Sequence, residues 1–321
     1  MIDNLTIVLP LKGRPEFTDR FLSHVCRWDC QVLVADGSLS PQRDRVQGYG
    51  VQYHCHEPDH TLADYWAKMV WALEMVTTPY AMVCDNDDFP LRGGLARCVE
   101  FLESHPDFVC ASGRIRGFWL FPEKTFGPIS YITRQYAPYD TPAVYGEDDV
   151  SDRVLAGFRN SWSYYAVYRT EALRQVWKGV HSLGLKDLMV HEKYCAMETL
   201  LQGKAVCFPG FASYLRQYET TLRNTDIEAD WAARFAKGEW MTDVQMVLAV
   251  MGAHGVDKQA LSHAWADWYA DHMNYHFGWR GRLRRKLKRG FPGLAYAFQH
   301  RHRIYPQRPN IHRILENDSL A

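Results

Sequence analysis

The sequence predicts an α/β fold, in which a mostly parallel sheet is sandwiched by helices and a helical appendix ends the 321-residue chain. Two observations support this prediction. Short apolar segments rich in β-branched residues alternate with segments whose apolar residues recur at helical spacing, as in a parallel sheet wrapped by helices. Beyond residue 218 only helical patterns remain. We therefore expect a domain over residues 1–218 and a helical region over residues 219–321.

The first half of the chain provides the alternating pattern. Residues 5–10 are continuously apolar, as in a buried central strand, and residues 16–28 follow with helical spacing. Thr61 is a suitable N-cap for a helix that continues to residue 76, before Pro79. Further strands are expected at residues 31–35, 51–55, 80–84 and 108–112, and a further helix at residues 93–104.

The second half is less regular. Residues 113–159 are rich in aromatic residues, Pro and Gly, and we expect loops and short strands that face a substrate, or alternatively a plain insertion. Strands are expected at residues 161–168 and 204–209, and helices at residues 170–177, 192–202, 231–250 and 257–277. The strand at residues 204–209 would close the sheet.

Composition excludes some classes of protein. Lys and Arg number 37, as do Asp and Glu, so the net charge indicates no particular partner. The eight cysteines are scattered without a Cys-x-x-Cys pair, which favours reduced core thiols in a cytoplasmic protein over a zinc site. The N-terminus lacks the pattern of a signal peptide, and no apolar run approaches the roughly 18 residues of a membrane span.

An acidic loop follows the expected strand at residues 80–84. Asp85 and Asp87 would point their oxygens into one small volume, where a hard divalent cation relieves their repulsion. The alternative is an acidic turn, because Asp and Asn are common where chains reverse direction. Residues 10–14 and 36–38 also follow expected strands, so three polar loops should converge at one edge of the sheet. This convergence favours the metal site.

These segments resemble family 2 glycosyltransferases, which use nucleotide-activated sugars on a GT-A fold. Residues 8–15 and 34–38 are similar to the first two loops of the family, and Asp85-Asn86-Asp87 matches its Asp-x-Asp element. The resemblance covers residues 4–218 and implies a nucleotide-sugar donor, with a UDP-sugar as the first choice. The donor-binding residues are expected to be Pro10, Lys12, Arg14, Asp36, Lys68, Asp85 and Asn86. For the three basic residues a solvated surface position is the alternative.

The resemblance also implies a metal and a catalytic base. Asp87, with Asp85 as a second ligand, would hold Mn²⁺ or Mg²⁺ on the donor diphosphate. His191-Glu192 is similar to the Glu-Asp motif of the family, so Glu192 is expected to take the acceptor proton, with Glu198 and His191 as alternatives. The alternative for Glu192 is a purely structural role, in which its negative charge interacts favourably with the dipole at the start of a helix. The Gln-x-x-Arg-Trp element of processive synthases is missing, which favours transfer of a single sugar.

A basic segment lies near the C-terminus. Seven cations fall between residues 280 and 289, and apolar residues recur every four positions from Trp279 to Phe291. This pattern is typical of an amphipathic helix on an anionic membrane surface. We expect residues 279–291 to attach a cytoplasmic protein peripherally to the inner face of the cytoplasmic membrane. The alternatives are a helix packed on the domain and a patch for nucleic acid or an anionic glycan, although no nucleic-acid-binding motif accompanies the segment and no nucleic acid is expected.

Together these patterns predict a metal-dependent, inverting glycosyltransferase. It would move one sugar from a nucleotide-sugar donor to a glycan or lipid-linked acceptor in cell-surface polysaccharide biosynthesis. Two alternatives stay open, namely a non-catalytic module that binds sugar nucleotides or a membrane surface, and a nucleotidyltransferase. A nucleotidyltransferase would be favoured by a Gly-rich loop after the first strand, but residues 11–14 contain a single Gly.

Overall fold

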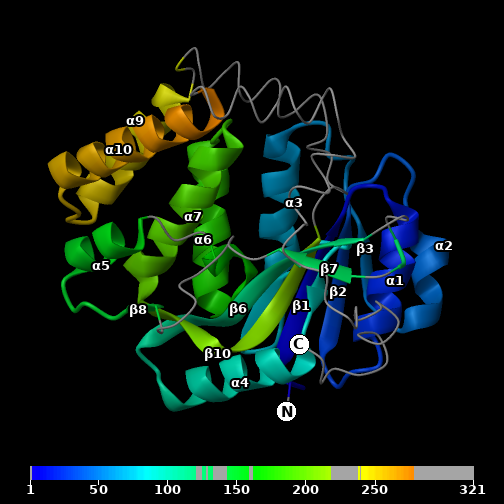
Figure 1. Cartoon of the computed structure of the whole chain (residues 1–321). Helices are drawn as coiled ribbons and strands as arrows, with labels where there is room; N and C mark the ends of the chain where they lie inside the picture. The colour runs from blue at the N-terminus through cyan, green and yellow to red at the C-terminus, as the bar shows by residue number, and fades with distance from the viewer. Residues whose placement is uncertain are drawn as a thin grey trace.

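The computed structural model describes residues 2–120, 125–127, 129–132, 143–158, 162–217, 238 and 240–277 (Figure 1). The predicted α/β architecture is confirmed, because one ten-stranded sheet runs through these residues with helices packed against it. Neighbouring strands follow the order β3-β2-β1-β4-β9-β6-β10-β5, while β7 pairs with β6 and β8 pairs with β10. The strands and helices expected in the first 112 residues occur in the predicted order, and the structure adds short elements at residues 43–49 and 89–90.

The N-terminal part of the sheet is parallel, as predicted. β1 (Leu5–Leu11) lies between β2 (Gln31–Asp36) and β4 (Tyr80–Val83), and β3 (Gln52–Cys55) pairs with β2. Every residue of β1 is buried, which explains why its sequence is continuously apolar. Because these strands run in the same direction, the loops that follow them reach the same edge of the sheet.

Helices connect these strands. They are α1 (Pro15–Val25), α2 (Arg43–Val46), the 3₁₀ turn η1 (Gln47–Tyr49), α3 (Leu62–Glu74) and α4 (Arg92–Ser104). α3 begins at the predicted cap, where the Thr61 side chain accepts a hydrogen bond from the Asp64 amide and the Asp64 carboxylate accepts one from the Thr61 amide. This reciprocal capping fixes the start of the helix that carries Lys68.

The C-terminal part of the sheet is mixed. The long strands β6 (Phe108–Leu120) and β10 (Lys204–Gln217) are parallel to each other, and β9 (Val167–Arg169) runs antiparallel to both β4 and β6. The short strands β5 (Phe89–Pro90), β7 (Ile129–Ile132) and β8 (Ala143–Tyr145) pair antiparallel with β10, β6 and β10, respectively. β9 thus lies between β4, in the parallel part of the sheet, and the two long strands β6 and β10.

Two of the expected strands differ from the structure. The strand expected at residues 204–209 is longer in the structure: β10 continues past Pro209, because the register with β6 shifts between Phe208 and Ala212 and pairing then resumes. The expected strand at residues 161–168 is wrong for residues 163–165, which form the 3₁₀ turn η2 (Ser163–Tyr165). Local turn hydrogen bonds there override the β-propensity of the aromatic residues.

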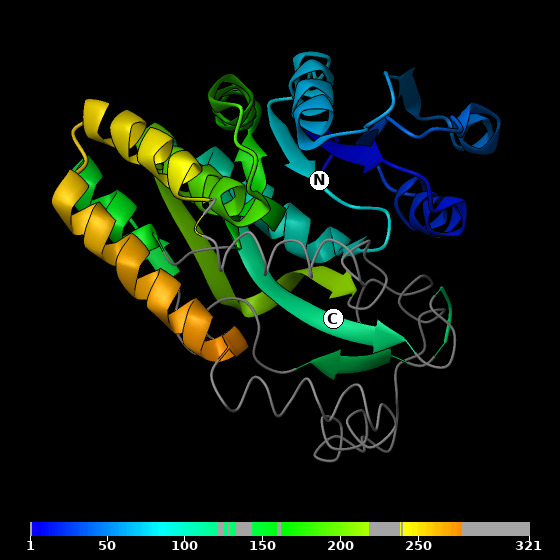
Figure 2. The same ribbon diagram turned by 90° about the horizontal axis from the view of Figure 1, so that it is seen from above.

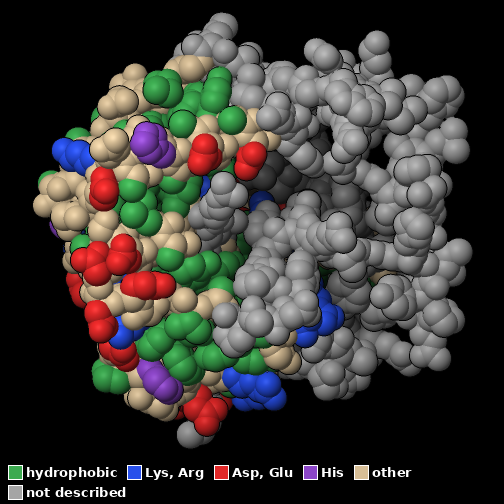
Figure 3. All heavy atoms as spheres, turned by 60° about the vertical axis from the view of Figure 1, so that its left-hand side comes forward, with side chains coloured by type: hydrophobic (Ala, Val, Ile, Leu, Met, Phe, Trp, Pro, Cys, Tyr) green, Lys and Arg blue, Asp and Glu red, His purple; other side chains and the backbone are tan. Residues whose placement is uncertain are grey.

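The remaining helices complete the core. α5 (Val150–Gly157), α6 (Thr170–Leu183) and α7 (Leu188–Gln202) precede β10, and α9 (Met241–Ala253) and α10 (Lys258–Phe277) form a pair beside α5 and α7 (Figure 2). Trp240, Val247, Met251 and Trp265 belong to the same hydrophobic core as the sheet. The described part of the helical appendix therefore extends this core, and the boundary at residue 218 stays a prediction. Figure 3 shows hydrophobic and acidic side chains interspersed on the described part of this side of the molecule.

Some expectations fall outside the described residues. The basic segment 279–291 is one of them, so its attachment to a membrane stays a prediction from the sequence. Within the described ranges, no helix combines the length and the apolar character needed to cross a bilayer. The eight cysteines are all free thiols, and five of them are buried.

A buried histidine makes the stability of this fold depend on pH. The His24 ring of α1 is fully buried, packs edge-on against Trp28 and Phe89, and its Nε2 lies 2.9 Å from the Pro90 carbonyl oxygen. Burial lowers the pKa of His24 from 6.5 to about 4, and nearby Arg27 adds to the shift. The folded protein therefore binds fewer protons at this site than the unfolded chain between these two pH values.

We predict that the free energy of unfolding rises with pH over this window, because stability rises wherever the unfolded state binds more protons. The His24 contribution should approach about 3 kcal/mol by pH 7, at 1.36 kcal/mol per pKa unit. Urea unfolding of the wild type and of His24→Gln at several pH values from 4 to 7 measures this contribution. The variant should show a shallower pH dependence, and equal slopes for the two proteins would contradict the prediction.

Candidate active site

Three loops meet at the carboxyl ends of the parallel strands. The Gly13 amide donates to Ser38 Oγ at 2.8 Å, and Gln42 Nε2 donates to the Gly13 carbonyl at 2.9 Å. Asn86 Nδ2 donates to the Arg14 carbonyl at 3.2 Å. The loops after β1, β2 and β4 are thus hydrogen-bonded to one another, and the predicted convergence is confirmed.

The loop after β1 has a constrained backbone. Gly13 and Arg14 have φ values of 73° and 56°, and Arg14 is the one non-glycine residue with positive φ among those the structure describes. Left-handed backbone is uncommon for a residue with a side chain and is found where the surroundings hold it in place. Here the Arg14 guanidinium pairs with Asp87 Oδ2 at 2.7 Å. Pro15, at the first turn of α1, follows directly and fixes where the helix begins.

Asp85, Asp87 and Asp88 form an acidic cluster in which one oxygen from each lies within 4.8 Å of the others. Asp88 is committed to the fold, because its two oxygens accept from the Tyr214 hydroxyl at 2.8 Å and the Gln217 amide at 2.7 Å. Burial raises the pKa of Asp88 well above its usual range, and the two neighbouring aspartates add to the shift. Asp88 therefore orients the loop.

The remaining two carboxylates fit a hard divalent cation, which prefers oxygen ligands from Asp and Glu. Asp85 is half-buried, and Asp87 is buried beside the guanidinium of Arg14. Burial lowers the pKa of Arg14, but Asp87 and Asp85 outweigh it and leave this pKa raised. Arg14 therefore stays charged at neutral pH, and a cation on Asp87 would compete with Arg14 for the Asp87 Oδ2 atom.

A cavity of about 240 Å³ opens beside this cluster. Its lining consists of Pro10, Leu11, Lys12, Arg14, Tyr65, Lys68, Asp85, Tyr164, Tyr165, Leu188, His191, Glu192 and Arg216. Most of the expected site residues are thus brought together. Of the others, Asn86 and Asp87 are buried and hydrogen-bonded to Arg14, which lines the cavity, and Asp36 is buried under the loop that follows β2.

The three candidate bases differ in position. Glu192, in the second turn of α7, lines the cavity. His191 also lines it but is 1% exposed and stacks on Trp66 with a centroid distance of 4.0 Å. Burial lowers the pKa of His191 to about 3, so its imidazole is a weak base. Glu198 does not line the cavity and accepts hydrogen bonds from Tyr194 and Gln202. Position therefore favours Glu192 over Glu198, and the lowered pKa of His191 makes that residue the weaker candidate.

The N-terminus of α7 is held by the helical appendix. Asp243 Oδ2, on α9, accepts from the Lys186 and Asp187 amides at 2.8 and 2.7 Å. Asp187 in turn caps α7 by accepting from the Met189 and Val190 amides. The turn that carries Glu192 is thus fixed by a residue more than 50 positions away, which no local pattern in the sequence could indicate.

A second cavity, of about 1010 Å³, adjoins the first and shares Lys12 with it. It is lined by Lys12, Gly13, Pro15, Gly37, Ser38, Leu39, Ser40, Pro41, Gln42, Asp44, Arg45, Asp59 and His60. Asp36 shapes its wall from beneath, since it is fully buried and accepts from the Ser38 and Gln42 amides and the Tyr53 hydroxyl. A direct contact of Asp36 with a nucleobase stays a prediction.

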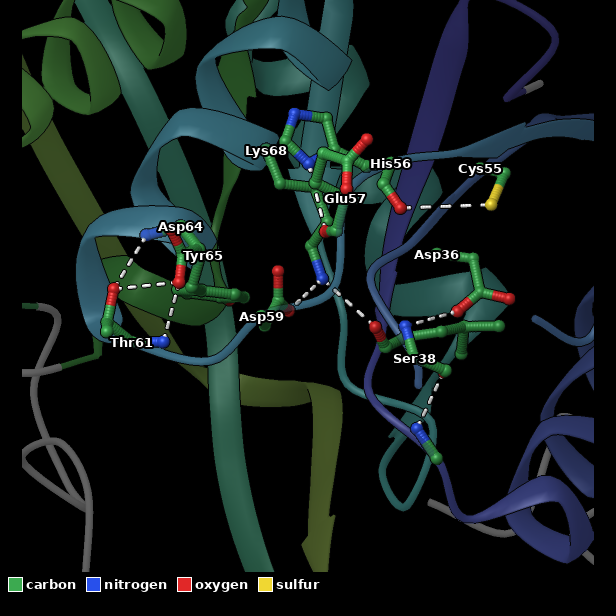
Figure 4. Close-up of polar contacts among 12 residues, drawn as sticks. Asp36, Ser38, Cys55, His56, Glu57, Asp59, Thr61, Asp64, Tyr65 and Lys68 are labelled. Atoms are coloured by element: carbon green, nitrogen blue, oxygen red, sulfur yellow. Dashed lines mark hydrogen bonds and ion pairs between the residues drawn. The ribbon is translucent and has the colours of Figure 1, made fainter. Parts of the chain in front are cut away.

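A buried ion pair separates the two cavities (Figure 4). Lys68 Nζ pairs with Asp59 Oδ2 and donates to the Leu11 carbonyl at 3.0 Å, and both charged side chains are almost completely buried. Burial lowers the pKa of Lys68 and raises that of Asp59, while the pairing opposes both shifts. Lys68 lines the smaller cavity and Asp59 the larger. The predicted solvated alternative for Lys68 is therefore wrong.

Several site residues were missed by reasoning from the sequence. Arg216 lines the smaller cavity and lies over the Tyr165 ring at 5.1 Å. Arg20 is buried under the acidic loop and donates to the Asp87 carbonyl at 2.7 Å. Asp59 lies between the strand expected at residues 51–55 and the helix that begins after Thr61, and this position was the one available signal.

Comparisons with known proteins agree with this architecture. No protein-family model matches the chain, and no curated protein matches it in sequence. The solved structure of Staphylococcus aureus TarS 1–349 superposes with a TM-score of 0.52 at 14% identity, over 93% of this chain and 77% of the TarS 1–349 chain. TarS 1–349 in complex with UDP gives 0.54 at 13% identity over 87% and 72% of the two chains, and the complex with UDP-GlcNAc gives 0.54 at 12% over 87% and 73%. At these identities the likeness shows the fold, and the predicted GT-A-type fold class is confirmed.

Gly37 provides a test of how the loops fit together. A Cβ at this position would lie 2.3 Å from Asp59 Oδ1, closer than atoms approach. We predict that Gly37→Ala lowers the free energy of unfolding by about 1–3 kcal/mol, the usual cost of overpacking. Gly48→Ala is the matched control, because a Cβ there meets no atom within 4 Å. Urea unfolding compares the two variants, and equal stabilities would mean that Asp59 moves away without cost.

Proposed function

We propose that this protein is a glycosyltransferase that moves one sugar from a nucleotide-sugar donor to a hydroxyl group of a glycan or lipid-linked acceptor. The observation that carries the proposal is that Asp85, at the end of β4, and Glu192, on α7, line one cavity together with the cations Arg14, Lys68 and Arg216. A sugar transferase needs these two carboxylate functions, one near the departing diphosphate and one near the incoming hydroxyl. The fold shared with TarS, crystallised with UDP and with UDP-GlcNAc, supports a uridine nucleotide as the donor.

The two cavities suggest how the donor lies. The larger cavity has room for the nucleoside, and Lys12, which lines both, would meet the diphosphate where the cavities join. The sugar would then occupy the smaller cavity. Tyr65 and Tyr164, whose hydroxyl groups are 3.2 Å apart, form part of its wall and offer both aromatic surface and hydrogen bonds to a sugar ring.

Arg14 has two anionic partners in this arrangement. Without a donor it neutralises Asp87, and a diphosphate at the cavity junction would offer it a second, bidentate partner. Arg14 would then release Asp87 toward a divalent cation shared with Asp85. Mn²⁺ or Mg²⁺ held by these carboxylates would neutralise the negative charge that develops on the departing diphosphate.

Glu192 would complete the reaction as the general base. Its carboxylate accepts the proton of the acceptor hydroxyl while the hydroxyl oxygen bonds to the anomeric carbon and the bond from that carbon to the diphosphate breaks. Attack from the face opposite the diphosphate inverts the anomeric configuration. The proposal therefore assigns donor activation to the loops after β1 and β4, and acceptor activation to α7.

The role of Glu192 can be tested with a matched pair of variants. Glu192→Gln removes the base but keeps the shape, so we predict a fall in kcat of about 10²–10⁴-fold with UDP affinity nearly unchanged. Glu198→Gln, six residues further along the same helix and away from the cavity, should keep most of the activity. Sugar-transfer assays and calorimetric titration with UDP measure both quantities. Full activity in Glu192→Gln would contradict the assigned base.

The metal site makes a separate prediction. Mn²⁺ should increase the rise in melting temperature that UDP causes, because ligands that bind the folded state stabilise it by mass action. Asp85→Asn and Asp87→Asn should each lose this metal-dependent increase. Asp29→Asn, which alters an exposed carboxylate paired with Arg92, should keep it. A metal-dependent increase that survives in both cluster variants would rule out the cation site.

A further inference from the structure

A buried arginine lies under the acidic loop without a carboxylate partner of its own. Arg20, on α1, is 2% exposed, and its guanidinium lies over the Phe17 ring at 4.8 Å and the Phe89 ring at 4.5 Å. Among the described residues no carboxylate pairs with it, and its Nε has no partner. Burial lowers the pKa of Arg20 to about 10, which leaves it charged at neutral pH. A buried charge without a paired counterion is costly, so its contacts indicate what it contributes.

Two backbone carbonyl groups hold this guanidinium. One terminal nitrogen of Arg20 donates to the Asp87 carbonyl at 2.7 Å, and the other donates to the Thr125 carbonyl, between β6 and β7, at 2.8 Å. Because the guanidinium is planar and its donors have a fixed geometry, two carbonyl groups and two aromatic rings together determine its position. Arg14 lines a cavity and can turn toward an entering ligand, whereas Arg20 lines neither cavity and stays in place.

The bond from Arg20 fixes the peptide group that joins Asp87 to Asp88. The N–H of this peptide group belongs to Asp88 and donates to the Asp85 carbonyl at 3.2 Å, whereas its C=O belongs to Asp87 and accepts from Arg20. Both polar atoms of the planar peptide group are therefore held. Since the plane of a peptide group and the directions of the adjacent side chains are linked through φ and ψ, Arg20 fixes how the Asp87 carboxylate lies relative to Asp85.

From this arrangement we propose that Arg20 is a positioning residue for the divalent cation, because it holds the peptide group that directs the carboxylates of Asp85 and Asp87 to one point. The inference rests on the proposed function, which puts Mn²⁺ or Mg²⁺ on these carboxylates. Groups that lie behind metal ligands orient those ligands and tune the affinity for the metal. By its charge alone Arg20 would repel a cation. Positioning and charge therefore predict opposite effects when Arg20 is replaced.

Calorimetric titration of UDP with and without Mn²⁺ tests the inference through binding alone. The measured quantity is the dissociation constant of UDP without Mn²⁺ divided by that with Mn²⁺, which we call the Mn²⁺ enhancement. Arg20→Lys keeps the buried charge but replaces the planar fork by one ammonium group, which is not equivalent at a site with two acceptors and two rings. Its Mn²⁺ enhancement should be about 10-fold smaller than that of the wild type, with UDP affinity in the absence of metal nearly unchanged.

Arg153→Lys is the matched control. Arg153, on α5, is 8% exposed and also donates to backbone carbonyl groups, among them those of Glu147 and Leu200, but it lines neither cavity. This variant should keep the full Mn²⁺ enhancement, because the same chemical change there leaves the acidic loop intact. Circular dichroism spectra establish that both variants are folded at the temperature of the titration. A full Mn²⁺ enhancement in folded Arg20→Lys would overturn the inference, as would an equal loss in Arg153→Lys.

Arg20→Met removes the charge and so determines the sign of the effect. Positioning predicts that its Mn²⁺ enhancement falls at least as far as in Arg20→Lys, whereas a rise would mean that Arg20 acts by repelling the cation and would overturn the inference. Should Arg20→Met not fold, Arg20→Lys decides. If the wild type shows no Mn²⁺ enhancement, the proposed cation site fails and the inference fails with it. A wild-type enhancement that both Arg20 variants retain overturns the inference alone.

Discussion

The ion pair between Arg14 and Asp87 is the interaction on which the candidate active site depends. Three carboxylates crowded at the end of β4 repel one another, and a left-handed arginine costs about 1–2 kcal/mol of backbone energy. The ion pair offsets both costs, because the left-handed backbone directs the guanidinium to Asp87 and the guanidinium neutralises this member of the cluster. Asn86 closes the arrangement by donating to the Arg14 carbonyl. The loops after β1 and β4 therefore hold each other in place.

The other side of the cavity is held differently. Glu192 lies on a helix whose start is fixed by a chain of hydrogen bonds from Asp243 through Asp187. The Trp66 indole adds a bond to the Leu185 carbonyl in the same loop. The donor side thus depends on the parallel sheet, whereas the acceptor side depends on packing between α3, α7 and α9. A helix expected to belong to an appendix is in fact part of the support of the site.

The sequence was informative about elements and loops but less so about individual side chains. Convergence of the three loops follows from parallel strands, which periodicity identifies well, and Thr61 capped its helix as expected. Asp85, Asn86 and Asp87 are consecutive, yet the first faces the cavity and the second points into α1, because the backbone of the turn decides their directions. Contacts between residues far apart in the sequence, such as Asp243 with Asp187, cannot be predicted from local sequence patterns.

The balance of charge at the site explains why a divalent cation suits it. The two cavities and the acidic cluster bring together the cations Lys12, Arg14, Arg45, Lys68 and Arg216 and the carboxylates Asp44, Asp59, Asp85, Asp87 and Glu192, with Asp88 behind them. These formal charges cancel, apart from that of Asp88, whose pKa is raised by burial and whose two oxygens are taken up by Tyr214 and Gln217. A doubly charged diphosphate entering a balanced, partly buried site would leave an excess of negative charge, which is costly at low dielectric. One divalent cation bound with the diphosphate restores the balance, so the proposed metal and donor should bind together.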